Sequence, residues 1–183
     1  AARQKYFKKH HDELRSFLMQ EPRGNDGIAA FLLPPLSQKV DYAMIMADYR
    51  GYVDMCLHGT IGVVTTLLEL GYPIRKSPQV TLETVAGQVE GTARIENGKV
   101  VDVTVANVPS FLYRSDEFNV PGFGKVKADI AFGGNFYVLL ESRQIGLNIT
   151  RENLPKIMET ASKLLPWFDR NVPTRHPLKK DIK

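Results

Sequence analysis

The hydrophobic pattern opens with a loose helical spacing over residues 4–19 and continues as short apolar or alternating segments. Such segments, bounded by Gly, Pro and polar residues, are typical of strands. Asn97-Gly98, between two of them, is a strong signal for a two-residue hairpin. The pattern therefore predicts an N-terminal helix that ends at residues 21–24, followed by strands at residues 28–33, 42–47, 80–85, 87–95, 100–105, 125–132 and 136–141.

Two more segments have helical periodicity. The first follows Thr60, the expected cap, and ends at Gly71; its apolar positions are Ile61, Val64, Leu67 and Leu68. Only Glu69 is charged in this segment, so the helix should be buried.

The second helical segment covers residues 153–165 and is amphipathic, and Pro166 is expected to break it. Its apolar side is expected to comprise Leu154, Ile157, Met158, Ala161 and Leu165. The acidic pair Asp116-Glu117 indicates a turn. Together the elements predict an α+β fold, in which a strongly curved, mostly antiparallel sheet surrounds the first of these two helices.

Composition agrees with one soluble domain. The chain has 183 residues, 43% of them hydrophobic, which is enough for a core. No apolar run approaches the ~20 residues that span a membrane, and the first residues resemble a charged helix rather than a signal peptide. One cysteine excludes an internal disulfide and favours a reducing, cytoplasmic location.

The formal charge of +4 does not indicate a nucleic-acid-binding protein. The basic residues gather at the two ends of the chain, and neither cluster alternates with aromatic residues as a base-stacking surface does. Solvated faces explain them better. The clusters comprise Lys5, Lys8, Lys9, His10 and His11 at one end, and Arg170, Arg175, Lys179, Lys180 and Lys183 at the other.

Cys56, the single cysteine, lies directly before the apolar helix in the segment Met55-Cys56-Leu57-His58-Gly59. The N–H groups and the positive dipole end at a helix N-terminus favour the thiolate form of a thiol and can also hold a carboxylate. One segment could therefore bind an amino acid by its carboxylate and present sulfur to its α-carbon. The residues leave open a buried structural thiol at Cys56 and, for His58, a structural hydrogen bond to a neighbouring strand.

Residues 55–63 resemble the first-cysteine motif of the proline racemase family, M-C-G-H-G-T-I-G. Four further segments are similar to segments of that family in the same order. They are His11-Asp12-Glu13-Leu14-Arg15, Glu21-Pro22-Arg23-Gly24, Asn107-Val108-Pro109-Ser110-Phe111 and Asp129-Ile130-Ala131-Phe132-Gly133-Gly134-Asn135-Phe136-Tyr137. The family comprises proline racemases, 4-hydroxyproline 2-epimerases and trans-3-hydroxyproline dehydratases, which use no cofactor.

The resemblance implies a diaminopimelate-epimerase-like half-domain and a catalytic role for Cys56, as general base for one enantiomer and general acid for the other. It implies that the backbone at Leu57, His58 and Gly59 binds the substrate carboxylate, although Leu57 stands where the motif has glycine. Ile28 falls where proline racemases often have a phenylalanine on the loop that closes the pocket. Its smaller side chain implies a substrate other than plain proline, or a looser pocket.

In the family a second cysteine lies in a downstream D-x-x-P-C-G-T-G segment, which this chain lacks. We therefore expect residues 1–183 to be a single domain, the N-terminal half of a pseudo-symmetric two-domain enzyme truncated at both ends. The expected partners are a small imino acid and the second domain of the same protein, with a homodimer left open.

The predicted function is cofactor-independent racemisation or epimerisation of proline or hydroxyproline, with the second catalytic residue outside this chain. Two alternatives stay open: a trans-3-hydroxyproline dehydratase, and a non-catalytic imino-acid-binding protein on the same scaffold. Other chemistries have little support, because the sequence contains no phosphate-binding G-x-x-x-x-G-K-[ST] and no H-E-x-x-H or C-x-x-C metal motif. Neither a metal nor a cofactor is expected.

Overall fold

The computed structural model describes residues 1–22, 24 and 27–182, and the chain forms two compact units. Unit 1 comprises Ala1–Pro109 together with Ile182, and unit 2 comprises Ser110–Asp181. Two residues of the sequence argument, Arg23 and Lys183, lie outside the described residues. The sequence analysis expected one domain over residues 1–183 and placed no boundary at Pro109. That single domain stays a prediction.

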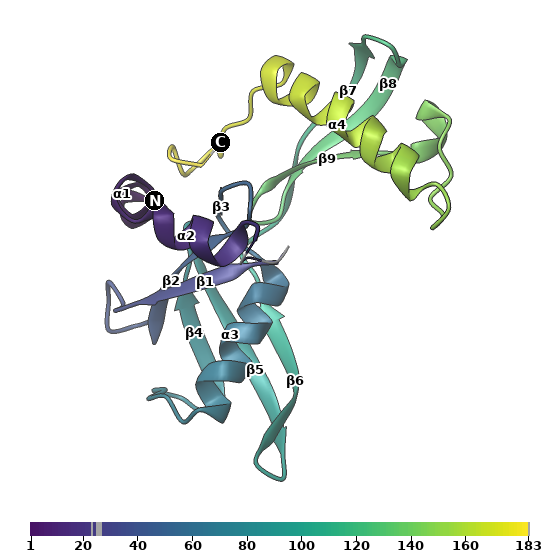
Figure 1. Ribbon diagram of the computed structural model, residues 1–183. Helices are drawn as coiled ribbons and strands as arrows, with labels where there is room; N and C mark the ends of the chain where they lie inside the picture. The colour runs from purple at the N-terminus through teal and green to yellow at the C-terminus, as the bar shows by residue number, and fades with distance from the viewer. Residues whose placement is uncertain (23, 25–26, 183) are drawn as a thin grey trace. The chain divides into compact units, whose positions relative to one another are not determined.

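Unit 1 contains a six-stranded sheet in the order β1-β2-β4-β5-β6, with β3 paired to β2 (Figure 1). All neighbours are antiparallel except β2 and β4, which run parallel. The strands are β1 (Ala29–Leu33), β2 (Tyr42–Ala47), β3 (Tyr52–Val53), β4 (Gln79–Glu83), β5 (Gln88–Glu96) and β6 (Lys99–Ala106).

The helix α3 (Leu57–Glu69) packs against this sheet along β5 and β6 (Figure 1). Its inner side chains Val64 and Leu67 are completely buried. The helix approaches β5 so closely that a Cβ added to Gly91 would lie 2.6 Å from Val64 Cγ2. Gly71, with φ of 70°, follows the helix end as expected. The predicted α+β fold with a mostly antiparallel sheet is confirmed, and α3 buries one face on that sheet while its other side, including Gly62, Thr66 and Glu69, is exposed.

The predicted N-terminal helix is interrupted. His11 has non-helical angles (φ −141°, ψ 21°), so the segment forms α1 (Ala2–His10) and α2 (Asp12–Met19). The interruption lets α2 turn Arg15 inward, where its guanidinium donates to the carbonyl oxygens of Asp48 and Tyr49 at 3.2 and 3.0 Å. The apolar residues Leu14, Phe17 and Leu18, which contribute to the helical spacing of this segment, are about half exposed.

Unit 2 contains the three-stranded antiparallel sheet β7-β8-β9, a 3-10 turn η1 (Ser142–Ile145) and the helix α4 (Leu154–Asn171) (Figure 1). The strands are β7 (Phe111–Val120), β8 (Gly124–Phe132) and β9 (Phe136–Leu140). The sequence prediction did not divide the strands between two sheets. The core of the unit lies between one sheet face and α4, and is formed by Phe118, Val120, Val126, Ala128, Ile130, Leu164, Phe168 and Val172.

Two predictions for unit 2 were wrong. Asp116 and Glu117 do not form a turn but lie within β7, where Glu117 pairs with Lys125 of β8 at 2.9 Å. Pro166 does not end α4, because continuing the helix buries Phe168, which is 3% exposed. Burial of that ring outweighs the loss of one helical hydrogen bond.

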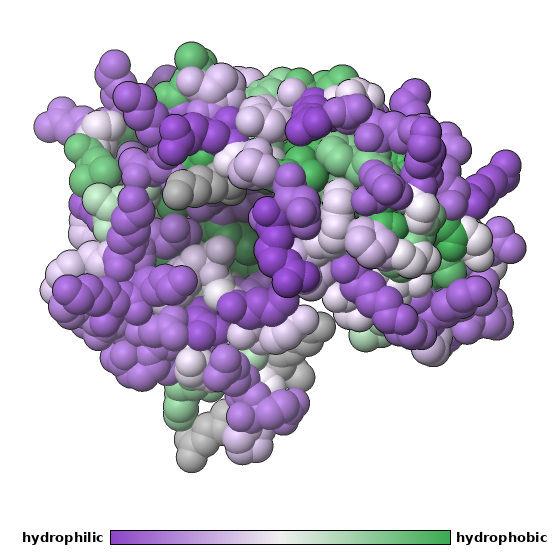
Figure 2. All heavy atoms as spheres, turned by 90° about the horizontal axis from the view of Figure 1, so that it is seen from above, coloured by the Kyte–Doolittle hydropathy of each residue, from purple (hydrophilic) through white to green (hydrophobic). Residues whose placement is uncertain are grey.

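The buried side of α4 also differs from the expected one, because Leu154, Met158 and Leu165 are exposed while Leu164 and Phe168 face the core. The surface seen in Figure 2 is mostly hydrophilic, with hydrophobic residues gathered at a few places. None of the helices described is both long and apolar enough to cross a membrane.

Candidate functional site

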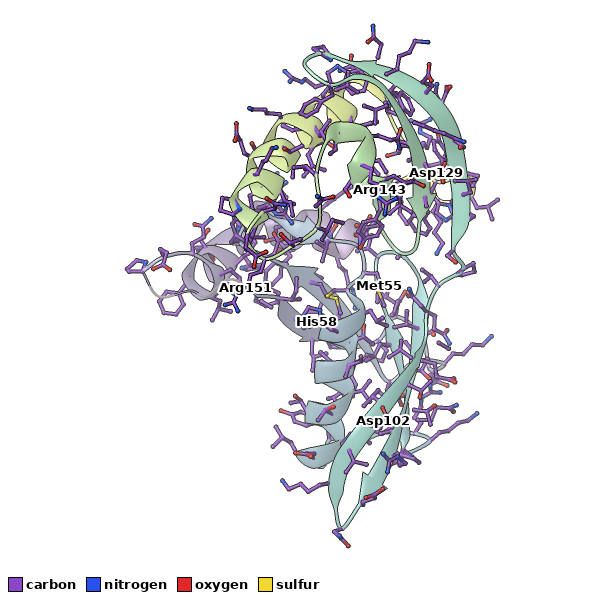
Figure 3. The ribbon with its side chains drawn as sticks, turned by 90° about the vertical axis from the view of Figure 1, so that its right-hand side faces the viewer. Met55, His58, Asp102, Asp129, Arg143 and Arg151 are labelled. Atoms are coloured by element: carbon purple, nitrogen blue, oxygen red, sulfur yellow. The ribbon has the colours of Figure 1, made fainter. Side chains whose placement is uncertain are left out.

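Cys56 occupies the junction between β3 and α3 in unit 1. The short strand β3 pairs with β2 through Val53 and Met46, and the chain then passes through Asp54 and Met55 into the helix. Met55 is buried, and the carbonyl oxygen of Asp54 accepts a hydrogen bond from the N–H of Ala86 at 3.2 Å. The hydrogen bond ties the junction to the turn between β4 and β5. Figure 3 labels Met55 and His58 near the start of α3.

The helix begins one turn earlier than expected. Cys56, not Thr60, is the N-cap residue, with extended backbone angles (φ −137°, ψ 120°) and no side-chain cap hydrogen bond. Thr60 is completely buried inside the first turn, and its hydroxyl donates to the carbonyl oxygen of Cys56 at 2.8 Å. The first-turn N–H groups of Leu57, His58 and Gly59 have no partner within the helix, as the geometry of any helix start requires.

Gly59 brings Ile28 and Cys56 together. A Cβ added to Gly59 would lie 3.2 Å from Ile28 Cγ2, 3.5 Å from Cys56 Sγ and 3.5 Å from Met46 Cε. The thiol, Ile28 and Met46 therefore all border the space that a side chain at Gly59 would fill. The thiol itself is half-buried.

Leu57 and His58 flank the thiol. Among the described residues Asn97 alone, apart from glycines, has a positive φ, so Leu57 adopts a helical backbone that its side chain tolerates. The side chain of Leu57 is 50% exposed. His58 Nδ1 lies 3.6 Å from Cys56 Sγ, so the imidazole contacts the thiol rather than a neighbouring strand.

A partly buried polar network lies before the site, around β3. The hydroxyl of Tyr52 donates to Asp12 Oδ1 at 2.8 Å, and the Arg15 guanidinium donates to both carboxylate oxygens of Asp12 at 2.8 and 2.9 Å. The hydrogen bond from Arg15 holds the pKa of Asp12 at about 2, while burial and Asp12 raise the pKa of Tyr52 to about 12. The network therefore keeps its charges near neutral pH. Closer to the thiol, burial raises the pKa of Asp54.

The structure thus places all five predicted site residues in one region: Cys56, Leu57, His58, Gly59 and Ile28. Sequence reasoning missed Met46 of β2, whose Cε borders the same space beside Gly59 as the thiol. It expected Thr60 as the helix cap and missed that its hydroxyl bonds to the carbonyl oxygen of Cys56, which the four-residue spacing could have indicated because a helical threonine often bonds in this way. Among the described residues no cluster of His, Cys, Asp and Glu is suited to a metal ion.

A sequence model of the family described as proline racemase matches residues 1–183. The chain belongs to the proline racemase family. It is 37% identical over 185 residues to the proline racemase of Clostridioides difficile, covering 99% of this chain and 55% of that protein. It is likewise 37% identical to the 4-hydroxyproline 2-epimerase of Streptosporangium roseum, covering 100% of this chain and 56% of that protein.

A solved structure of this family has the same fold. The crystal structure of a probable proline racemase from Agrobacterium radiobacter, with bound carbonate, superposes with a TM-score of 0.86 at 36% identity. The match covers 93% of this chain and 52% of that chain. The chain therefore spans about half the length of the curated family members that it matches.

Proposed function

We propose that this chain supplies one of two proton-transfer groups of a cofactor-independent racemase or epimerase that acts on proline or hydroxyproline. Cys56 is the group that it supplies. The observation that carries the proposal is the position of the thiol at the N-cap of α3, half-buried and next to three first-turn N–H groups. A carboxylate bound to those N–H groups would hold its α-carbon close to sulfur.

The reaction needs one proton removed and one returned. The Cys56 thiolate takes the α-proton and becomes a thiol, and the electron pair left on the α-carbon is delocalised into the carboxylate. A donor on the opposite face then protonates the planar carbon, which inverts the centre. In the reverse direction the Cys56 thiol is the donor. We propose that the second group comes from the second domain of the same protein.

The surroundings of Cys56 favour this chemistry. Ile28 and Met46 border the space beside Gly59 that the thiol also borders, and apolar groups there would limit the access of water to the site. Because the thiol must stay reduced, we also propose a cytoplasmic location. A homodimer is a further proposal, which light scattering tests.

The test uses the full-length protein that carries this chain, and compares it with Cys56→Ser. We expect the substitution to nearly abolish both inversion and solvent deuterium incorporation at the α-carbon, because an alkoxide is far too disfavoured near neutral pH to replace the thiolate. Binding of pyrrole-2-carboxylate, a planar mimic, should largely persist because the backbone N–H groups remain. Chiral chromatography, mass spectrometry and calorimetric titration give the three readouts.

Two results would contradict the proposal. If the parent protein binds an imino acid but never exchanges its α-proton, it is a binding protein. If it eliminates water from trans-3-hydroxyproline instead of inverting it, it is a dehydratase. The 183-residue chain alone should give no inversion, since stereoinversion needs proton donors on both faces and Cys56 is its single thiol.

A further inference from the structure

The hydroxyl of Thr60 is buried within the first turn of α3. The side chain is 0% exposed, and a valine would fill the same space without a polar atom to desolvate. A buried hydroxyl is tolerated when it is hydrogen-bonded, and Thr60 Oγ1 donates to the carbonyl oxygen of Cys56 at 2.8 Å. The partner of this hydroxyl is thus the backbone of the residue that carries the thiol.

The same carbonyl oxygen also accepts the first hydrogen bond of α3, from the N–H of Thr60 at 3.0 Å. Both lone pairs of the oxygen are therefore engaged by one residue. Two donors fix the peptide plane between Cys56 and Leu57, and the residue held in this way carries the Sγ atom that lies 3.6 Å from His58 Nδ1. A single helical bond would leave this plane freer to rotate.

The hydroxyl also changes the electrostatics at sulfur. The carbonyl oxygen of Cys56 is the negative end of the dipole nearest to its own side chain, and it disfavours a second negative charge on sulfur. A hydroxyl proton on that oxygen offsets part of this effect. We propose that Thr60 is a positioning residue for Cys56, which fixes the thiol and favours its thiolate form by bonding to the carbonyl. The proposal deepens the proposed function and rests on it.

The helix provides a matched control. Thr65 and Thr66 make the same kind of bond one turn later, from their hydroxyls to the carbonyl oxygens of Ile61 and Gly62 at 2.9 and 2.8 Å. Neither carbonyl belongs to a site residue. Any general effect of removing a threonine hydroxyl from α3 should therefore appear equally in Thr65→Val.

The experiment measures alkylation of Cys56 by iodoacetamide across pH 6–10 in the full-length protein that carries this chain, with the modified Cys56 peptide quantified by mass spectrometry. We expect Thr60→Val to alkylate about three-fold more slowly than the parent at pH 7, as the loss of a modest hydrogen bond predicts, with the profile displaced to higher pH. Thr65→Val should match the parent. Thr60→Ser, which keeps the hydroxyl, should alkylate like the parent.

A merely structural role predicts the opposite sign, because a loosened helix exposes the thiol and speeds its alkylation. Equal rates in Thr60→Val and Thr65→Val, or a faster rate in Thr60→Val, would overturn the proposal. If Thr60→Val does not fold, Thr60→Ser and Thr60→Ala provide the comparison, since both lack the methyl group and they differ by the hydroxyl alone. Equal rates in that pair would also overturn it. Failure here leaves α-proton exchange by the full-length protein intact, so the two proposals fail separately.

Discussion

The contact between Gly91 of β5 and Val64 of α3 gives a quantitative test of how the site helix is held on its sheet. In Gly91→Ala the new methyl group would lie 2.6 Å from Val64 Cγ2, well inside the normal carbon–carbon separation of about 3.5–4.0 Å. Val64 is completely buried and cannot rotate into solvent. The helix or the strand must therefore shift.

Overpacking of this kind costs about 1–3 kcal/mol of the free energy of unfolding. Val64→Ala leaves a cavity and loses buried apolar surface, which costs roughly 2 kcal/mol. In the double variant the methyl group at residue 91 fills part of the space left by the valine. The two changes should then be non-additive, with the double variant more stable than the sum predicts by about 1–2 kcal/mol.

Urea denaturation of the four proteins gives this coupling free energy. Gly62→Ala is the matched control, because the same substitution on the exposed side of α3 has no heavy atom within 4 Å and should stabilise the helix by up to ~1 kcal/mol. Additivity within about 0.5 kcal/mol would refute the close approach of α3 to β5.

Other predictions concern pH and buried charge. Burial lowers the pKa of His176, so the unfolded chain binds its proton more readily; stability should fall as the pH drops below about 6.5, and His176→Asn should lack this step in thermal melts. The pKa of Asp12 is held at about 2 by Arg15, so its contribution should persist at neutral pH and disappear as the pH falls from about 4 towards 2, a loss absent in Asp12→Asn. The carboxylate of Asp41 is 2% exposed and accepts N–H groups from Arg75 and Thr81. Asp41→Asn turns one acceptor into a donor, and should cost about 2 kcal/mol by urea denaturation.

Local patterns predicted much of the fold. The apolar run 42–47 became β2 with the expected bounds, and Asn97 and Gly98 both have positive φ (50° and 77°), as a hairpin turn of that sequence requires. Each of these two patterns lies within a few consecutive residues, so the local sequence is enough to determine the local structure.

The errors arose where distant residues decide the outcome. The charged residues of β7 lie in a strand because β8 supplies their partners, for example Ser115 to Asp129 at 2.6 Å and Glu117 to Lys125 at 2.9 Å. The sequence of β7 alone contains no such information. Likewise Pro166 stays helical because the residues after it reach a core that forms from another part of the chain.

Most of the candidate site could be predicted from the sequence because its residues are close together along the chain. Cys56, Leu57, His58 and Gly59 are consecutive, so one motif contains them, and the resemblance to the family pointed to Ile28. Met46 could not be predicted, because its place beside Gly59 depends on how β2 lies beside α3. Contacts between residues of different elements can be identified only once the arrangement of the strands and helices is known.

The parallel pairing of β2 with β4 has a consequence for how the thiol acquires its surroundings. Tyr42 pairs with Leu82 and Ala43 with Glu83, and the chain between these strands carries β3, Cys56 and α3. Closing this long loop costs chain entropy before the contacts on either side can repay it. During refolding, the rate at which a fast thiol reagent modifies Cys56 should therefore change from its unfolded to its native value together with closure of the β2–β4 pair, later than formation of the local β5–β6 hairpin. The residue proposed for proton transfer is thus also a natural reporter of the slowest topological step of unit 1.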